Sequence, residues 1–290
     1  MELFLSTLIN GLSMGGVYAM IALGYTMVYG IAKMLNFAHG DIIMVGGYTI
    51  FLMMAHQNPI LAAIAAVVVC MVLGILIEKI AYKPLRGASP LAVLITAIGV
   101  SYLLQSLAQI IFGTGGKMVI LYDLGTVSLF GVNVLVSTLI TLGVATVVMT
   151  CLTLFVKYTR LGRAMIAVSE DRGAAQLMGI NVNRIITITF AIGSALAALA
   201  GFFTLLRSPA VSNTMGAMPG IKAFTAAVIG GIGSIPGAML GGILLGLVES
   251  IAGRITVIAP YTDAIEFSIL IIILLVKPTG FLGKKRREKV

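Results

Sequence analysis

The chain has 290 residues, of which 59% are hydrophobic and only 10% are charged, and its net charge is +9. Soluble domains hold roughly 25% charged residues, so this composition excludes a soluble globular protein and predicts an integral membrane protein. Apolar windows of about 20 residues, the length that a helix needs to cross a membrane, recur along the chain. They lack the two-residue alternation of an outer-membrane barrel, so we expect an all-α, polytopic transmembrane bundle.

Eight apolar windows are expected to be membrane-spanning helices, and together they make one domain over residues 1–290. In chain order they cover residues 8–31, 40–55, 60–78, 90–112, 132–156, 185–206, 236–255 and 262–276. The opening MELFLSTLIN lacks the basic region and cleavage site of a signal peptide, so the first window is expected to be a retained span. A break at Asn10-Gly11 would fit the length of that window.

The distribution of Lys and Arg predicts which loops face the cytoplasm, because short cytoplasmic loops carry an excess of both. The polar segment 157–184, here called the island, and the tail at residues 277–290 are strongly basic and are expected to be cytoplasmic. Three windows lie between the island and the tail, and an odd number of crossings would place the two on opposite faces of the membrane. Residues 221–234 (IKAFTAAVIGGIGS) are therefore predicted to form a ninth segment, a short or broken helix. That segment is either a pathway element or an ordinary short helix with a tight glycine turn. The N-terminus and the loop 113–130 are expected outside.

Polar residues between the first two windows are candidates for function, because polar groups within a membrane are costly. The stretch LNFAHGD contains Asn36, His39 and Asp41. A histidine and a carboxylate two residues apart could relay protons or bind a metal, but a closed zinc site needs four ligands. The interpretation that we favour is that these residues cap the second helix and order the turn before it.

Later windows contain further polar residues. Gln105 and Gln109 stand four residues apart, so they share one helix face that is expected to look into the bundle or a wet cavity. Glu249 could pair with Arg254 near one membrane interface. Interhelical hydrogen bonding explains these residues as well as contact with a substrate does. The candidate pathway residues are Asn10, Asn36, His39, Asp41, Gln105, Gln109 and Glu249.

Small residues are expected to serve helix packing. Gly15-Gly16, Gly46-Gly47 and the GGxxxG run at residues 241–246 are patches that let helix backbones approach closely. Cys70 and Cys151 lie within apolar windows and are expected to be buried and unpaired.

No motif in the chain predicts catalysis, a metal site or a cofactor. Two histidines give no argument for a catalytic triad, and neither a His-Glu-x-x-His nor a paired-cysteine motif occurs. The stretch FGTGGKM fails as a phosphate loop, since Ile111 replaces its first glycine and Met118 replaces its Ser or Thr. Binding to lipid head groups explains the basic charge, so we expect no nucleic-acid partner.

The island is predicted to contain one short helix of about nine residues. Ser169 is the expected N-cap, Glu170 and Asp171 follow in the first turn, and Gly179 is a natural stop. A helix this short is not stable alone, so it is expected to dock against another protein.

The sequence of that helix resembles a known family. GAAQLMG, residues 173–179, is similar to the cytoplasmic coupling loop of bacterial ABC importer permeases, although Gly173 stands where many such loops have glutamate. The wider run LGRAMIAVSEDRGAAQLMGINV, with LNFAHGDIIMVGGY and GGIGSIPGAMLGGILLG, resembles permeases of branched-chain, or hydrophobic, amino-acid uptake systems. The likeness extends over essentially the full chain.

The resemblance implies a transport subunit of the bacterial inner membrane that has no ATPase site of its own. Its implied partners are a second permease subunit, which would make a heterodimer, two cytoplasmic ATPase subunits, and a periplasmic or lipid-anchored substrate-binding protein. The implied coupling helix inserts into the ATPase and moves when ATP binds. The residues expected to make that contact are Glu170, Asp171, Arg172, Ala174, Ala175 and Gly179.

Other functions remain open from the residues alone. An ion-coupled secondary transporter is the main alternative, but the chain shows few buried acids and no two obviously broken helices at matching positions. A membrane enzyme and a purely structural subunit are weaker alternatives. The same importer class also includes carriers of urea and short amides.

Overall fold

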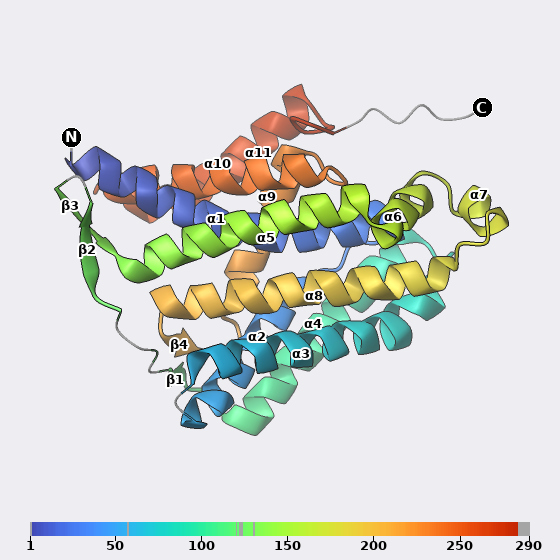
Figure 1. Ribbon diagram of the computed structural model, residues 1–290, viewed down its shortest axis with the longest axis horizontal. Helices are drawn as coiled ribbons and strands as arrows, with labels where there is room; N and C mark the ends of the chain where they lie inside the picture. The colour runs from blue at the N-terminus through green and yellow to red at the C-terminus, as the bar shows by residue number, and fades with distance from the viewer. Residues whose placement is uncertain (1, 57, 120, 122–123, 130, 284–290) are drawn as a thin grey trace.

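A computed structural model describes residues 2–56, 58–119, 121, 124–129 and 131–283 as an elongated bundle of helices (Figure 1). Seven helical stretches in this part of the chain are long and apolar enough to cross a membrane. They are α1 (Glu2–Ala32), α3 (Pro59–Ile77) with η2 (Glu78–Tyr82) and η3 (Lys83–Leu85), α4 (Pro90–Phe112), α5 (Val136–Tyr158), α8 (Val182–Arg207), α10 (Ile235–Arg254), and η4 (Ala259–Tyr261) with α11 (Thr262–Val276).

Two further apolar helices are shorter. Helix α2 (His39–Met53), which η1 (Met54–His56) follows, has 15 residues and α9 (Ala217–Gly230) has 14. At about 1.5 Å per residue each falls short of a hydrocarbon core of about 30 Å. The eight windows and the ninth short segment correspond to nine apolar helices, but window 40–55 was wrong as a full crossing, because α2 is nearly as short as the segment α9. Helix α9 ends in a tight glycine turn, where Gly231 has a φ of +106°.

Helices α2 and α9 begin close together inside the bundle and run in opposite directions. His39, the first residue of α2, packs against Gly24 in the middle of α1: a Cβ on Gly24 would overlap the His39 ring. The start of α9 contacts the same region, since a Cβ on Gly40 would lie 2.6 Å from the Gly216 carbonyl oxygen. Each therefore resembles one half of an interrupted membrane helix.

Glycines allow α1 and α10 to pack backbone against backbone. A Cβ on Gly15 would lie 2.7 Å from the Ile243 Cα, and a Cβ on Gly246 would overlap the backbone of Gly15. Gly46 similarly contacts α8 at Ala198. The glycine patches therefore serve tight packing, as predicted.

The island and the last described residues lie at one end of the bundle, which we call the island end (Figure 1). The Phe281 amide donates to the Ile229 carbonyl oxygen over 2.9 Å, and an arginine of the island bonds the C-terminal end of α1. The N-terminus of α1 lies at the opposite end, called the far end, where Ser250 Oγ donates to the Thr7 carbonyl oxygen over 2.7 Å.

Short strands cover part of the far end. Strand β1 (Lys117–Met118) pairs with β4 (Ala210–Val211), and β2 (Thr126–Leu129) forms a hairpin with β3 (Val132–Leu135). The window expected over 132–156 therefore begins as a strand, and its helix α5 starts four residues later.

Two smaller points differ from the sequence analysis. The break considered at Asn10-Gly11 does not occur: α1 is helical through both residues, and Gly11 packs against α10. Cys70 is buried, but Cys151 is exposed on the outer surface of α5. Both cysteines are free, as expected.

Candidate docking site at the island end and the far-end cavity

The island folds into two helices instead of one. Helix α6 (Arg160–Glu170) begins at Thr159, whose Oγ1 accepts from the Gly162 amide over 2.9 Å. Helix α7 (Arg172–Leu177) begins at Asp171, whose Oδ1 accepts from the Ala174 amide over 3.0 Å. The predicted N-cap Ser169 was wrong: its hydroxyl donates to the Ile166 carbonyl oxygen within α6. The short carboxylate of Asp171, on extended backbone, makes the cap and separates the helices.

Helix α7 ends in a turn that pushes two apolar side chains into the open. Gly179 has a φ of +81°, and the Ile180 amide donates back to the Ala175 carbonyl oxygen over 3.0 Å. Leu177 is 91% exposed and Met178 is 83% exposed. Sequence reasoning missed this pair, although two apolar residues directly before a glycine stop in a polar segment were a visible signal.

The six residues expected to contact a partner do not share one surface. Glu170, Asp171, Ala174 and Gly179 are exposed, but Ala175 is buried against the rest of the chain. A hollow of about 500 Å³ lies between α7 and the start of α8. Residues 172–173, 176 and 179–183 line it.

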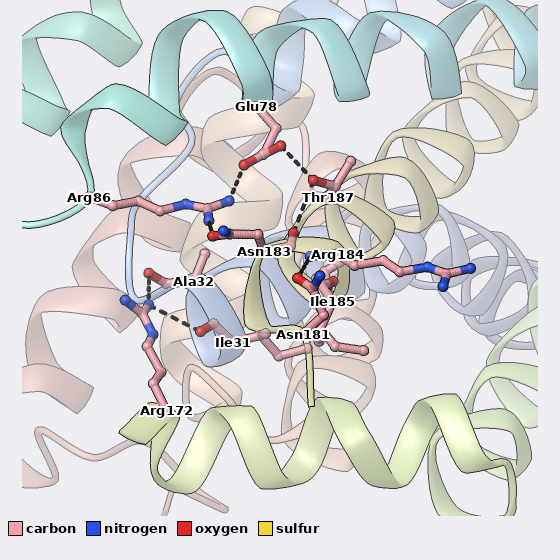
Figure 2. Close-up of polar contacts among 11 residues, drawn as sticks. Ile31, Ala32, Glu78, Arg86, Arg172, Asn181, Asn183, Arg184, Ile185 and Thr187 are labelled. Carbon is pink, nitrogen blue, oxygen red and sulfur yellow. Dashed lines mark hydrogen bonds and ion pairs between the residues drawn. The ribbon is translucent and has the colours of Figure 1, made fainter. Parts of the chain in front are cut away.

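Arg172 points toward α1 (Figure 2). Its Nη2 donates to the Ile31 carbonyl oxygen over 3.2 Å and to the Ala32 carbonyl oxygen. Lys33 bonds the preceding carbonyls of Tyr29 and Gly30. The last turn of a helix has carbonyls without intrahelical partners, and cations stabilise it. Arg172 is therefore a C-terminal cap of α1 supplied by α7.

Burial also acts on the charge of Arg172. It lowers the pKa of the guanidinium, and the positive charge of Arg86 lowers it further. Arginine stays protonated at neutral pH despite such a shift, so the side chain keeps its capping charge.

A second polar network joins the α3–α4 connection to α8 (Figure 2). Glu78, in the π-helix η2, is fully buried and forms an ion pair with Arg86. Its other carboxylate oxygen accepts from Thr187 Oγ1 over 2.7 Å, and Arg86 also donates to Asn183 Oδ1. A buried carboxylate needs such partners, because one left alone would be costly. The network holds the start of α8 against the α3–α4 connection.

The far end contains a cavity of about 790 Å³ between α1, α5, α8, α9, α10 and η4–α11. Asn10 and Glu249, two of the candidate pathway residues, line it. On α1 the lining residues recur at helical spacing: Thr7, Asn10, Met14 and Val17. The same helix thus carries a cavity wall near its start and the Arg172 cap at its end.

The expected pair of Glu249 and Arg254 does not form. Glu249 Oε1 lies 3.1 Å from Lys222 Nζ, and its Oε2 accepts from the Tyr18 hydroxyl over 2.6 Å. Arg254 donates instead to Ser6 Oγ over 3.0 Å. Sequence reasoning did not single out Lys222; a lysine inside a glycine-rich apolar segment was the signal.

The group in LNFAHGD is buried and lies outside that cavity. Helix α2 has no side-chain cap, so the expected capping role was wrong. Asn36 Oδ1 instead accepts from the Tyr82 hydroxyl over 2.9 Å, and Asp41 Oδ1 accepts from Gln105 Nε2 over 2.8 Å. These bonds replace capping because the start of α2 is enclosed by α1, α3 and α4. His39 contacts the ring of Tyr25, with ring centroids 4.7 Å apart.

Metal binding and the shared face of the two glutamines are the remaining expectations for these polar residues. Within the described ranges, no group of three or more His, Cys, Asp or Glu is placed to hold a metal ion. Gln105 looks into the bundle, but Gln109 is exposed on the outer side of α4. The predicted shared face is therefore only partly inside the bundle: Gln105 contacts α2, whereas Gln109 lies outside that contact.

The chain is similar to known transport permeases. The family described as "Branched-chain amino acid transport system / permease component" matches residues 7–274. The high-affinity branched-chain amino acid transport system permease protein BraD of Pseudomonas aeruginosa is 44% identical, over 99% of this chain and 98% of the relative. The corresponding protein LivH of Escherichia coli (strain K12) is 40% identical over the same shares.

Solved structures add a likeness in fold. PsaBC from Streptococcus pneumoniae, solved in complex with Fab, superposes with a TM-score of 0.52 at 15% identity. The match covers 96% of this chain and 93% of the other. At this identity it supports the helical architecture alone.

Proposed function

The chain belongs to the branched-chain amino acid transport permease family, and from that premise we propose that it is the permease subunit of an ABC importer. The importer moves branched-chain or other hydrophobic amino acids into the cytoplasm, driven by ATP hydrolysis on separate subunits. The observation that carries the proposal is helix α7. It presents an exposed apolar tip outward and is bonded inward to a cavity-lining helix.

The tip of α7 is the proposed contact with the ATPase. Leu177 and Met178 would enter an apolar pocket of the partner, because large exposed apolar side chains gain most when such a pocket buries them. Glu170, Asp171, Ala174 and Gly179 surround them and would fix orientation and partner choice. Gly179 allows the turn that presents the pair.

Arg172 is the proposed link between that contact and the pathway. When ATP binding moves α7, the guanidinium pulls or releases the C-terminal carbonyls of α1. Because α1 is one continuous helix, its displacement reaches the wall of the far-end cavity. In this proposal Arg172 transmits force within the chain and does not touch the ATPase.

The remaining partners and the orientation follow from the same proposal. The island and residues 277–290 face the cytoplasm, which the basic residues of both support. The basic residues of the tail from Lys284 onward lie outside the described residues. The far-end cavity then opens toward a periplasmic or lipid-anchored binding protein. The apolar outer faces of α3, α4 and α11 meet lipid or a second permease subunit.

The test is co-purification of the complex with variants at the α7 tip. We expect Leu177→Glu combined with Met178→Glu to remove the ATPase subunits, because a carboxylate cannot enter an apolar pocket without a partner. Val257→Glu is the matched control, since Val257 is 81% exposed and lies in the loop at the far end. It should keep the complex intact.

Two results would count against the proposal. If the double variant keeps the ATPase subunits with normal uptake, α7 is not the docking helix. If wild-type uptake needs no ATPase and follows a proton or sodium gradient, the chain is a secondary transporter.

A further inference from the structure

Helices α9, α10 and α11 bring four ionisable side chains together beside the far-end cavity. Lys222 Nζ lies 3.1 Å from Glu249 Oε1, 2.8 Å from Asp263 Oδ1 and 3.3 Å from Glu266 Oε2. Lys222, Glu249 and Asp263 line the cavity, although most of the Lys222 side chain is buried, and Glu266 is fully buried behind them. We call these four residues the charge cluster.

The charge cluster holds more negative than positive charge. One ammonium group faces three carboxylates, and the Tyr18 hydroxyl that bonds Glu249 is neutral. Glu266 is fully buried, and its Oε1 has no hydrogen-bond partner in the part of the chain that the structure describes. A buried polar atom without a hydrogen-bond partner is costly. The cluster therefore has acceptor oxygens and excess charge for one more cation.

Nearby arginines do not supply that cation. Arg207 and Arg254 also line the cavity, and Arg254 bonds Ser6 Oγ. Across the described ranges neither arginine forms an ion pair with the cluster. The cavity wall thus presents carboxylates in one place and a guanidinium in another. A zwitterion is complementary to such a surface, whereas an inorganic cation would interact only with the carboxylates.

Resting on the proposed function, we propose that the charge cluster is a site on the translocation pathway that binds the α-ammonium group of the amino-acid cargo. Lys222 already places one primary ammonium among these oxygens, so the oxygen set suits that chemistry. Glu249 and Asp263, which border the cavity, are the residues that the cargo ammonium contacts. The cavity volume of about 790 Å³ falls within the range of about 300–1,000 Å³ for small-molecule sites.

The complete importer, reconstituted in liposomes with its binding protein, provides the first test. Asp263→Asn removes one cavity-facing charge and leaves Lys222 paired with Glu249 and Glu266. We expect leucine uptake per ATP hydrolysed to fall about tenfold, the loss that follows from roughly one charge-assisted contact. Stimulation of hydrolysis by the loaded binding protein should persist. Asp263→Glu should restore coupling, and Glu2→Gln, an exposed acid at the same end outside the cavity, should leave it unchanged.

A binding measurement separates the charge cluster from a structural role. The purified complex is heated with isopentylamine, which has the ammonium without the carboxylate, or with 4-methylpentanoate, which has the reverse. Isopentylamine should raise the melting temperature of the wild type and of Glu2→Gln but not of Asp263→Asn. 4-Methylpentanoate should not distinguish Asp263→Asn from the wild type.

Three outcomes would overturn the inference. Normal coupling in Asp263→Asn would mean that the cluster does not bind cargo. Equal stabilisation of wild type and Asp263→Asn by isopentylamine would make the cluster structural. Wild-type uptake that depends on sodium or potassium at constant ionic strength, with that dependence lost in Asp263→Asn, would assign the site to an inorganic cation. Wild-type leucine uptake with and without ATP separates failure of the inference from failure of the proposed function. If that uptake shows no ATP dependence, the proposed function itself is wrong.

Discussion

At the island end, the side chain of Arg172 bonds α7 to α1. Arg172 belongs to a helix of six residues, too short to be stable alone, yet it caps a helix of 31. Its two carbonyl partners are the last two residues of α1. Losing the guanidinium leaves these acceptors without their cap and separates α7 from α1.

Arg172→Ala should uncouple transport without removing the ATPase. Uptake per ATP is expected to fall several-fold, while Leu177 and Met178 still hold the partner. Arg184→Ala removes the same charge from an arginine at the start of α8 whose guanidinium points away from the network (Figure 2). The measurement is leucine uptake against phosphate release in proteoliposomes. Equal coupling in the two variants would contradict the role given to Arg172.

Loss of Glu78 should lower the stability of the permease. Glu78→Ala leaves the Arg86 guanidinium without its carboxylate partner, and breaking such a buried pair costs about 3–5 kcal/mol. Thermal unfolding of the purified permease in detergent should show a lowered Tm. The exposed Glu170→Ala is the control and should unfold close to the wild type. An unchanged Tm for Glu78→Ala would mean that the network contributes little.

Helix contacts depend on where small residues meet. Gly246 and Gly15 let the backbones of α1 and α10 touch, and no rotamer change can make room there because the obstacle is main chain. Gly253, near the end of α10, carries no such constraint: a Cβ there would meet no heavy atom within 4 Å.

The contrast within α10 gives a matched prediction. Gly246→Ala should separate α10 from α1 and lower the yield of folded permease by a large factor. Gly253→Ala should be neutral or slightly stabilising, by up to about 1 kcal/mol, since alanine favours the helix. Size-exclusion profiles and Tm values of the two variants decide the matter. Similar behaviour of both would show that the α1–α10 contact tolerates separation.

The two ends of the molecule differ in structure. At the island end α7 is bonded to α1, and at the far end lies the cavity with its charge cluster. Helix α1 runs between them, and the oppositely directed short helices α2 and α9 meet in the interior. Transport by alternating access requires that such ends face different compartments.

Labelling of single cysteines tests this orientation. In a Cys151→Ser background, with Cys70 buried, and with the permease expressed without the ATPase subunits, Leu177→Cys should react with a membrane-impermeant maleimide only after the cytoplasmic face is opened. Val257→Cys should react in intact spheroplasts. The positive-inside distribution of Lys and Arg is the physical reason. The reverse pattern of labelling would invert the topology.

The sequence by itself determined the fold class, the approximate positions of nine apolar helices, including the short α9, and the extent of the island. These depend on local properties: a run of apolar residues long enough for the membrane, a glycine that stops a helix, and a cluster of basic residues. Even locally, the choice between Ser169 and Asp171 as the cap needed the backbone path.

Only the tertiary structure decided which distant groups meet. Glu249 lies five residues from Arg254, yet it pairs with Lys222 on another helix. The cap of α1 by Arg172 and the contact of α2 with α9 join residues more than 100 positions apart. Helix periodicity gives each residue a face but not the neighbour of that face. Packing of several apolar helices, with desolvation of every charge caught between them, selects the partner.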